Sequence, residues 1–228
     1  MQAQSGAIES VRIDPLTGKV HYKTIGNTPA KGICGSGLID CLAELFLDGI
    51  IDRAGHFQNS QKEYMLVPAD KSAEGKSIVI TQDDINKLMR TKGAVNAALD
   101  VLLESVGVNL SAIERFYAAG AFGQYLDLES AVTVGIYPDL PREEMVRLGN
   151  TSGEGARLVL TSNQERREAE DIIKKMTYFE LIANPEFMNR FVGSMFLPHT
   201  NLEYFPSVKK KILNRKNIQK GKSINQAS

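Results

Sequence analysis

The 228-residue sequence has no long hydrophobic run. None of its apolar stretches approaches the roughly 20 residues that a membrane-spanning helix needs, and the N-terminus lacks the charged-then-apolar pattern of a secretory signal. Apolar residues make up 43% of the chain and charged residues 24%, which is the composition of an ordinary soluble protein. We therefore expect a cytoplasmic protein that has no membrane partner.

Cysteine is scarce as well. The two cysteines, Cys34 and Cys41, are seven positions apart, one in a glycine-rich loop and the other about two helical turns further on. That separation disfavours a disulfide, and the chain has nothing with the spacing of a zinc or iron–sulfur site. We expect two reduced thiols and no metal site in this chain.

The sequence also lacks a self-contained set of catalytic residues. Its three histidines, His21, His56 and His199, are scattered, and none has a partner at metal-ligand spacing. Neither a G-x-x-x-x-G-K-[ST] phosphate loop nor a G-x-G-x-x-G motif occurs, and the glycines around Ser36 do not form the G-x-S-x-G elbow of hydrolases. We therefore predict no catalytic residue, and we expect His199 to make a structural hydrogen bond.

Positive charge is concentrated at the C-terminus. Residues 209–228 contain seven of the 27 basic residues and no acid, which leaves 20 basic against 27 acidic residues, or about −7, in the rest of the chain. An acidic body argues against a nucleic-acid-binding protein. We therefore divide the chain into a folded domain at 1–208 and a basic tail at 209–228, which we expect to be solvated and disordered.

Local patterns near the N-terminus predict a hairpin followed by a helix. Alternating apolar residues in 7–13 and 19–25 flank the turn-forming segment 14–18, which is typical of a β-hairpin. Ser36 is expected to cap a helix that ends near Asp48, before Gly49.

The longest helix is expected after two short strands at 64–67 and 78–80. Thr81 and Asp84 have the spacing of a capping box, although aspartate is a weaker choice than glutamate at the second position. Apolar residues then recur at three- and four-residue intervals as far as Val106, so one face of the helix should be buried.

Lys92 and Gly93 interrupt the apolar stripe of that helix. A glycine inside a helix costs about 1 kcal/mol relative to alanine, so its presence asks for a reason. One interpretation is that the lysine stem crosses the protein surface and the glycine allows a close contact with another helix. The alternative is that both residues face a ligand.

The second half alternates strands with helices. A strand at 115–119 runs into a glycine turn at 120–123 and a short helix at 126–134. Further helices are expected at 149–160, 164–176 and 184–195, with a strand at 177–181. Because strands and helices are interleaved, we predict an α/β fold.

Two glycine clusters predict a ligand-binding surface. The segment 32–37 stands directly before an amphipathic helix, where free N–H groups and the helix dipole favour an anion. The turn at 120–123 has glycines without a Cβ, so a flat ligand can approach its backbone. Together they suggest a nucleotide between two glycine-lined edges. The candidate residues are Gly35, Ser36 and Gly37 in the first cluster and Gly120, Ala121, Phe122 and Gly123 in the second.

At these motifs the chain resembles the C-terminal portion of the ATP-dependent reductive activators of corrinoid proteins. These are iron–sulfur proteins that rescue oxidised cob(II)alamin in methyl-transfer systems. The resemblance runs in order from about Gly6 to Val208. Its segments are Gly32-Ile-Cys-Gly-Ser-Gly-Leu-Ile-Asp40, Ile80-Thr-Gln-Asp-Asp-Ile85, Arg90-Thr-Lys-Gly-Ala94, Phe116-Tyr-Ala-Ala-Gly-Ala-Phe-Gly-Gln-Tyr-Leu-Asp127, Gly149-Asn-Thr-Ser-Gly-Glu-Gly-Ala156, Lys175-Met-Thr-Tyr-Phe-Glu-Leu181 and Phe196-Leu-Pro-His-Thr-Asn-Leu-Glu-Tyr-Phe-Pro206.

This resemblance implies the fold shared by acetate and sugar kinases, heat-shock chaperones and actin (ASKHA), in which two ribonuclease-H-like halves close on ATP. The chain would be one such half with an added hairpin and helices. By this analogy 116–123 packs against the adenosine, and the helix through Arg90, Lys92 and Gly93 lines the other side of the base and ribose. The implied ligands are ATP or ADP, with magnesium in the intact protein. The implied partner is a corrinoid protein, and the family also allows a homodimer.

The sequence departs from the family in what it does not contain. In such activators a ferredoxin-like [2Fe–2S] domain and the Asp-x-Gly-Thr phosphate loops lie upstream, and this sequence begins at a point that resembles their downstream side. Magnesium and the phosphates need carboxylates and a backbone cradle, and an electron needs a redox centre. We therefore expect the chain to be inactive without a missing N-terminal half or an upstream-encoded polypeptide.

Three functions follow from these observations. The first is the adenosine-facing, partner-binding portion of a corrinoid activator. The second is a non-enzymatic interaction module of the same fold, because an apolar face without its mate tends to recruit a partner. A stand-alone kinase or phosphatase is disfavoured because the phosphate loops are absent.

Overall fold

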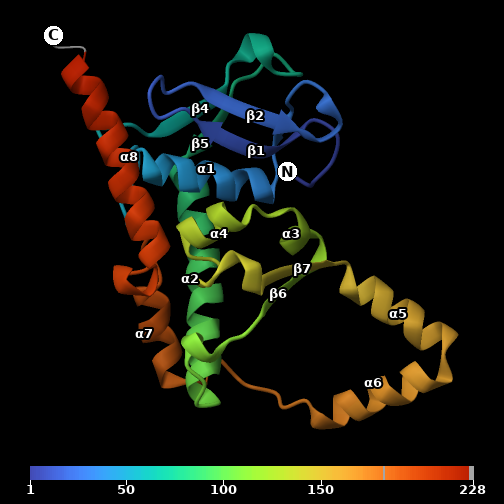
Figure 1. Ribbon diagram of the computed structural model, residues 1–228. Coiled ribbons are helices and arrows are strands. Elements are labelled where there is room, and N and C mark those ends of the chain that lie inside the picture. Colours follow the sequence, from blue (N-terminus) through green and yellow to red (C-terminus); the bar gives the residue numbers. More distant parts are fainter. Residues whose placement is uncertain (182, 226–228) are drawn as a thin grey trace.

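The computed structural model describes residues 1–181 and 183–225 (Figure 1). Strands β1, β2, β4 and β5 and helix α1 form one end of the molecule, and β6, β7, α3 and α4 form its middle. Helices α2 and α8 run lengthwise along these parts, while α5 and α6 project from them as an arm. In the described residues, no helix combines the length and apolar character that crossing a bilayer requires.

The predicted hairpin is present and has one further strand beside it. Strand β1 (Ala7–Ile13) pairs antiparallel with β2 (Val20–Thr24), and the short β3 (Gly32–Ile33) pairs in parallel with the start of β1. The turn between β1 and β2 is fixed by Asp14, whose Oδ1 accepts the N–H groups of Leu16 and Thr17. The 3-10 turn at Ile25–Asn27 leads from β2 towards β3.

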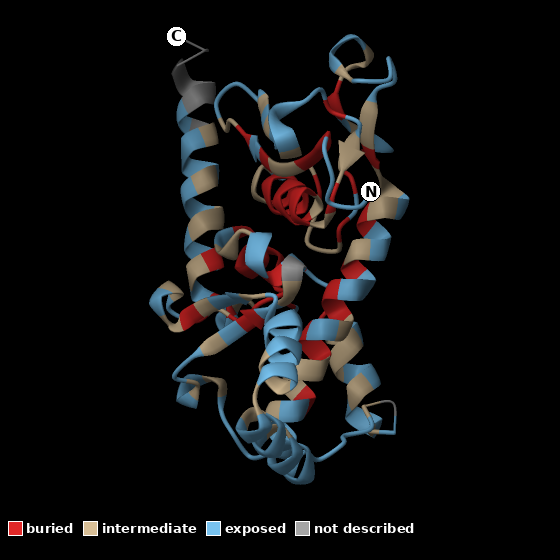
Figure 2. Cartoon of the chain, turned by 90° about the vertical axis from the view of Figure 1, so that its right-hand side faces the viewer, coloured by how far each residue is buried: buried red, intermediate tan, exposed pale blue. Residues whose placement is uncertain are grey.

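Helix α1 (Gly35–Leu47) packs directly on β1 and forms the centre of the core. Its buried residues stand out in Figure 2. An ideal Cβ at Gly37 would lie 2.4 Å from the Ile8 carbonyl oxygen, so only glycine permits this close approach. The predicted N-cap at Ser36 is wrong, because Cys34 occupies the cap position and Ser36 lies in the first turn.

A second hairpin and the longest helix follow α1. Strand β4 (Glu63–Val67) pairs antiparallel with β5 (Ile78–Thr81), with a 3-10 turn at Ala69–Lys71 between them. Helix α2 (Gln82–Ser105) then begins with the predicted capping box, in which Thr81 Oγ1 accepts the Asp84 N–H and the Asp84 carboxylate accepts the Thr81 N–H. Both hydrogen bonds satisfy otherwise unpaired groups at the helix start.

Two parallel strands form the third sheet. Strand β6 (Phe116–Ala119) pairs with β7 (Met145–Gly149), and the chain between them forms α3 (Gly120–Tyr125) and α4 (Leu128–Val134). Short 3-10 turns at Leu110–Ala112 and Arg142–Glu144 precede the two strands. The predicted turn at 120–123 is the first part of α3, and β7 was not predicted.

Helices α5 (Thr151–Thr161) and α6 (Asn163–Lys175) form the arm. Neither helix contains a buried residue, and both appear largely exposed in Figure 2. The strand predicted at 177–181 is wrong, because the chain there is irregular and Tyr178 is 81% exposed.

The C-terminal part consists of two more helices. Asn184 caps α7 (Pro185–Gly193), as predicted, and α7 packs along α2. A 3-10 turn at Leu202–Tyr204 leads into α8 (Pro206–Asn225), so residues 209–225 of the predicted disordered tail are helical, while residues 226–228 lie outside the described residues. Arg215 holds this helix to α1 through Asp48 (Nε to Oδ1, 2.6 Å) and Glu44 (a terminal guanidinium nitrogen to Oε2, 2.8 Å).

Candidate functional site

The carboxyl ends of the two parallel strands lie side by side and open into helices. Gly120 (φ 87°) directly follows β6, and Gly149 (φ 68°) is the last residue of β7; both lie in the left-handed region that favours glycine. An ideal Cβ at Gly149 would lie 3.0 Å from Gln124 Oε1, so the second turn touches α3. In open α/β sheets, ligands bind outside the carboxyl ends of the strands. We call these two turns the glycine edge.

The first glycine cluster meets the second at one point of this edge. An ideal Cβ at Gly35 would lie 2.8 Å from Phe122 Cε2, so the Phe122 ring rests on the backbone at the start of α1. Half of the Phe122 side chain stays exposed. Nothing lies within 4 Å of the place that a Cβ would take at Gly120. The edge therefore offers an aromatic ring beside open backbone, a surface that suits a flat heterocycle.

The remaining residues of the first cluster are used to hold α1 on β1. Ser36 is 7% exposed, and its hydroxyl donates to the Glu9 carbonyl (2.9 Å). Gly37 touches the Ile8 carbonyl, as described above. The structure thus assigns Ser36 and Gly37 to packing, and of this cluster only Gly35 faces Phe122. In the second cluster, Gly123 packs against Ala118, and the side chain of Ala121 lies outside the described residues.

Lys92 is not available to a ligand, which corrects its prediction as a nucleotide donor. Its side chain is fully buried, and the ammonium donates to the carbonyls of Ser194 (2.5 Å), Phe196 (2.6 Å) and Pro198. These three bonds use all of its N–H groups. Burial lowers the pKa of Lys92 to about 7. The interpretation of a stem crossing the surface is also wrong.

The other predicted residues of α2 do not join the glycine edge either. An ideal Cβ at Gly93 would lie 3.1 Å from Met195 Sδ, which confirms the close helix contact interpreted from the sequence. Arg90 is exposed on α2. Helix α2 packs mainly on α7 and β5, whereas α3 packs on β6, β7 and α1. In the described residues the two predicted walls of the site thus pack mainly on other elements, and their shared nucleotide role stays a prediction.

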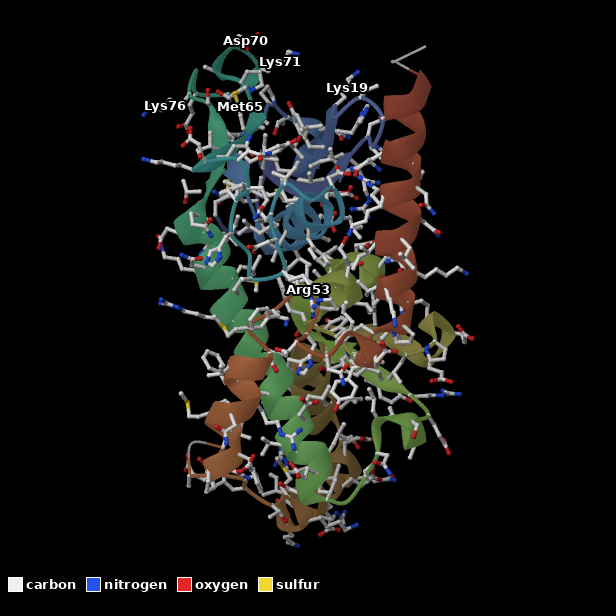
Figure 3. All side chains as sticks on the ribbon, turned by 90° about the vertical axis from the view of Figure 1, so that its left-hand side faces the viewer. Lys19, Arg53, Met65, Asp70, Lys71 and Lys76 are labelled. Atoms are coloured by element: carbon white, nitrogen blue, oxygen red, sulfur yellow. The ribbon has the colours of Figure 1, made fainter. Side chains whose placement is uncertain are left out.

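Arg53 is partly buried and makes three hydrogen bonds to backbone carbonyls that the sequence did not predict. It follows α1 and lies in the middle of the molecule in Figure 3. Its guanidinium donates to the carbonyls of Leu197 (3.3 Å), His199 (2.5 Å) and Thr200 (2.9 Å). No local pattern indicates this role, because its acceptors are backbone groups about 145 positions away.

The described residues do not fit every group that the resemblance implies. A [2Fe–2S] cluster is held by four cysteines or by cysteine with histidine, whereas the chain has two cysteines, both buried. Within the described residues, no three His, Cys, Asp or Glu side chains gather closely enough to hold a metal ion. The glycine edge offers the Phe122 ring beside open backbone, but no acidic residue belongs to the predicted site to hold magnesium.

The glycine edge is an open wall. Cavities of about 470, 440 and 300 Å³ occur elsewhere in the described structure, and none is lined by a predicted site residue. A nucleotide bound here would need a second wall from another polypeptide segment, since ligand sites usually bury most of the ligand surface.

Comparison with known proteins identifies the family. A family model described as the C-terminal domain of RACo, the ASKHA domain, matches residues 1–209. The chain belongs to this family. It is 33% identical to the corrinoid activation enzyme RamQ of Eubacterium limosum over 215 residues, a match that covers 86% of this chain and 36% of RamQ. It is 30% identical over 180 residues to the [Co(II) methylated amine-specific corrinoid protein] reductase of Methanosarcina barkeri, covering 78% of this chain and 31% of that protein.

A solved structure gives the same result for the fold. The reductive activator for corrinoid, iron–sulfur protein superposes with a TM-score of 0.85 at 43% identity, covering 91% of this chain and 35% of that one. The predicted α/β, ribonuclease-H-like ASKHA fold is therefore confirmed. The chain spans about a third of the length of the relatives that it matches.

Proposed function

We propose that this chain is the adenosine-facing, partner-binding portion of an ATP-dependent reductive activator of corrinoid proteins. The observation that carries the proposal is the contact between Gly35 and Phe122 at the carboxyl ends of β6 and β7. Family membership and relatives with activities on corrinoid proteins support it. In this role the chain works in the cytoplasm with a corrinoid protein as its partner, and a second copy is a further candidate partner.

The proposed site holds the purine rather than the phosphates. The exposed half of Phe122 would stack on the base, and the open space at Gly120 would admit the base or ribose close to the backbone. Bound ATP would supply the free energy for closing the site around it. It can shift the population towards the closed form only if it binds the closed form more tightly than the open form. Gly35 keeps the Phe122 ring in place, because a larger residue would displace it.

We further propose that the chain is inactive alone. The described residues offer neither four cysteine ligands nor an acidic cluster for magnesium, and the relatives are about three times longer. In the proposed whole machine, a [2Fe–2S] cluster would supply the one electron that the reduction of cob(II)alamin to cob(I)alamin requires. Both the cluster and the phosphate-binding loops would come from polypeptide outside this chain.

The β6–β7 sheet supports the proposal that a further polypeptide segment packs beside it. Parallel sheets are normally covered on both faces and rarely consist of two strands alone. Among the residues that the structure describes, β6 pairs only with β7, and Tyr117 and Ala119 are exposed. We therefore propose that the rest of the activator, on the same or a separate polypeptide, covers β6 when the site is complete.

A non-enzymatic interaction module is the second candidate. The arm of α5 and α6 favours it, because both helices lack buried residues and carry exposed apolar side chains, among them Leu160 (78% exposed) and Ile173 (65%). Under this alternative the chain binds another polypeptide and no nucleotide.

Titration of the purified chain with ADP separates the two functions. We expect saturable binding in calorimetry, no ATP hydrolysis by the chain alone, and ATP hydrolysis after the addition of a polypeptide that carries the ferredoxin-like domain and the phosphate loops. An absence of binding at millimolar ADP, both alone and with that polypeptide, would leave the interaction module as the better explanation.

A further inference from the structure

A cavity of about 470 Å³ that the proposed nucleotide site does not use lies beside the second half of α2. Its walls come from α2, the turn after it, α7 and the segment that leads into α8. It is separate from the glycine edge, because Leu110 and Pro138 place it before the strands begin rather than at their carboxyl ends. Its volume falls in the range of about 300–1,000 Å³ that small-molecule sites occupy.

Two acidic residues of α2 line this cavity, and only one of them is neutralised. Glu104 accepts a hydrogen bond from Arg190 of α7 (3.1 Å). In the described part of the chain, no donor lies within hydrogen-bond or ion-pair distance of the Asp100 carboxylate. Asp100 is partly buried, and burial raises its pKa, although the charges of Arg190 and Lys92 counteract this. A carboxylate in this position is stabilised by a cation that enters the cavity.

The other polar residues at the cavity do not supply that cation. His199 Nδ1 accepts the Asn201 N–H (3.0 Å), so this nitrogen carries no proton, and burial lowers the His199 pKa. The buried Lys92 ammonium is held by three carbonyls. Asn96 is satisfied at both ends, by the Gly135 carbonyl and by the Ser194 hydroxyl.

The remaining lining is mainly apolar. Its side chains can surround a hydrophobic body next to Asp100, and burying that body supplies about 25 cal/mol for each square ångström removed from water. The apolar and aromatic residues of the lining are Leu99, Leu103, Val108, Leu110, Pro138, Tyr204 and Phe205.

We infer that this cavity binds a small organic monocation, an amine with an apolar body, whose ammonium pairs with Asp100. Because Glu104 is already paired to Arg190, Asp100 is the acidic residue of the lining that has no ion pair within the described residues, and one such carboxylate matches a single positive charge on the ligand. The site is independent of the nucleotide role proposed above, because it shares no residue with the glycine edge.

Three probes with the same apolar body measure this preference on the full chain: phenethylammonium, phenethyl alcohol and 3-phenylpropionate. We expect phenethylammonium to bind at least tenfold more tightly than the alcohol, and 3-phenylpropionate to bind most weakly. Asp100→Asn should reduce the affinity for the cation to that for the alcohol, without changing the affinity for the alcohol. The preference should also weaken as salt is raised, because it is electrostatic.

Asp171→Asn is the matched control. It removes the same charge from an exposed position on α6, where Asp171 pairs with Lys174, and should leave all three affinities unchanged. Phe122→Ala should leave them unchanged too, so that a failed nucleotide site would not affect the result. Equal affinities for the three probes, no binding at millimolar concentration, or an Asp100→Asn variant with the parent's preference would each overturn the inference.

Discussion

Lys92 and Arg53 bind the same stretch of backbone, the segment 194–200 between α7 and α8. Lys92 donates to the carbonyls of residues 194, 196 and 198, whereas Arg53 donates to those of residues 197, 199 and 200. Both cations are more than 100 positions away from this segment in the sequence. Together they donate to six of its seven carbonyl groups. This arrangement fixes the connection between α7 and α8.

Replacing Lys92 should therefore be costly. Lys92→Met keeps most of the buried stem but leaves three carbonyls without donors, and we expect a loss of about 3 kcal/mol or more in the free energy of unfolding. Urea denaturation followed by circular dichroism measures it. Lys87→Met is the control on the same helix, because Lys87 is exposed and its solvent-screened pair with Asp83 should contribute little to stability. Equal losses of unfolding free energy for both variants would contradict the stabilising role of the three hydrogen bonds from Lys92 to the carbonyls.

His199 should make stability depend on pH in the mildly acidic range. Burial and the nearby Lys92 charge lower the His199 pKa below its ordinary value of 6.5, so the folded state binds fewer protons than the unfolded state. Its contribution is fully present above pH 6.5 and is lost as the pH falls through the lowered pKa. We expect the free energy of unfolding to fall between pH 7 and pH 5, by at most about 1.4 kcal/mol per pH unit from this group.

His199→Gln isolates that contribution. Glutamine does not titrate, and its side-chain oxygen can accept the Asn201 N–H that His199 Nδ1 accepts. The difference in unfolding free energy between parent and variant should therefore change across this pH range. A constant difference would show that His199 titrates alike in the folded and unfolded states.

Sequence patterns predicted the features that depend on neighbouring residues. The hairpin turn at Asp14 and the capping box of Thr81 and Asp84 are made by groups within four positions of each other, so their chemistry can be read locally. The meeting of Gly35 with Phe122 was anticipated only as two glycine-lined edges around a ligand. Their direct contact depends on how α1 and α3 pack.

Features that depend on distant partners were not predicted. Lys92 was noticed as an interruption of an apolar stripe, but its three acceptors lie 102 to 106 positions away. The basic segment 209–225 has the composition of a disordered tail, yet it is helical, and Arg215 pairs it with Glu44 and Asp48 at the end of α1. Strand β7 is short, and it is defined by its pairing with β6, which the local sequence does not indicate.

Gly37 should tolerate no side chain. In Gly37→Ala the new Cβ would meet the Ile8 carbonyl oxygen at 2.4 Å, so backbone must shift, and we expect a loss of about 2–3 kcal/mol in unfolding free energy. Gly155→Ala is the matched control. It lies in exposed α5 with nothing within 4 Å of the new Cβ, and alanine raises helix propensity there. A Gly37→Ala variant as stable as the parent would contradict this packing of α1 on β1.

Arg215 should be required for docking of α8. Its side chain is 17% exposed, and it donates to Asp48, to Glu44 and to the Ile13 carbonyl (2.7 Å). Arg215→Met removes the cation paired with the mostly buried Asp48 and leaves Glu44 only its longer pair with Arg12 (3.9 Å), and we expect a loss of about 3–5 kcal/mol in unfolding free energy.

The control for this helix is Lys209→Met. Lys209 pairs with Glu203, but both side chains are largely exposed, so its loss should cost less than about 1 kcal/mol. Hydrogen exchange gives a second readout, because amides of α8 should lose protection in Arg215→Met and keep it in Lys209→Met. Unchanged protection in both variants would mean that α8 is held by other contacts.

The proposed nucleotide site requires Phe122 to contribute to ADP binding. If its exposed half stacks on the base, Phe122→Ala should weaken ADP binding by about 1–3 kcal/mol, which is roughly fivefold to a hundredfold in Kd. Gly35→Val should weaken it as well, because its Cβ would lie 2.8 Å from the ring and displace it. Tyr125→Ala, an exposed aromatic residue on the same helix, is the control and should bind like the parent. Calorimetry on the complete chain measures all three, and parent-like binding by both Phe122→Ala and Gly35→Val would place the nucleotide away from the glycine edge.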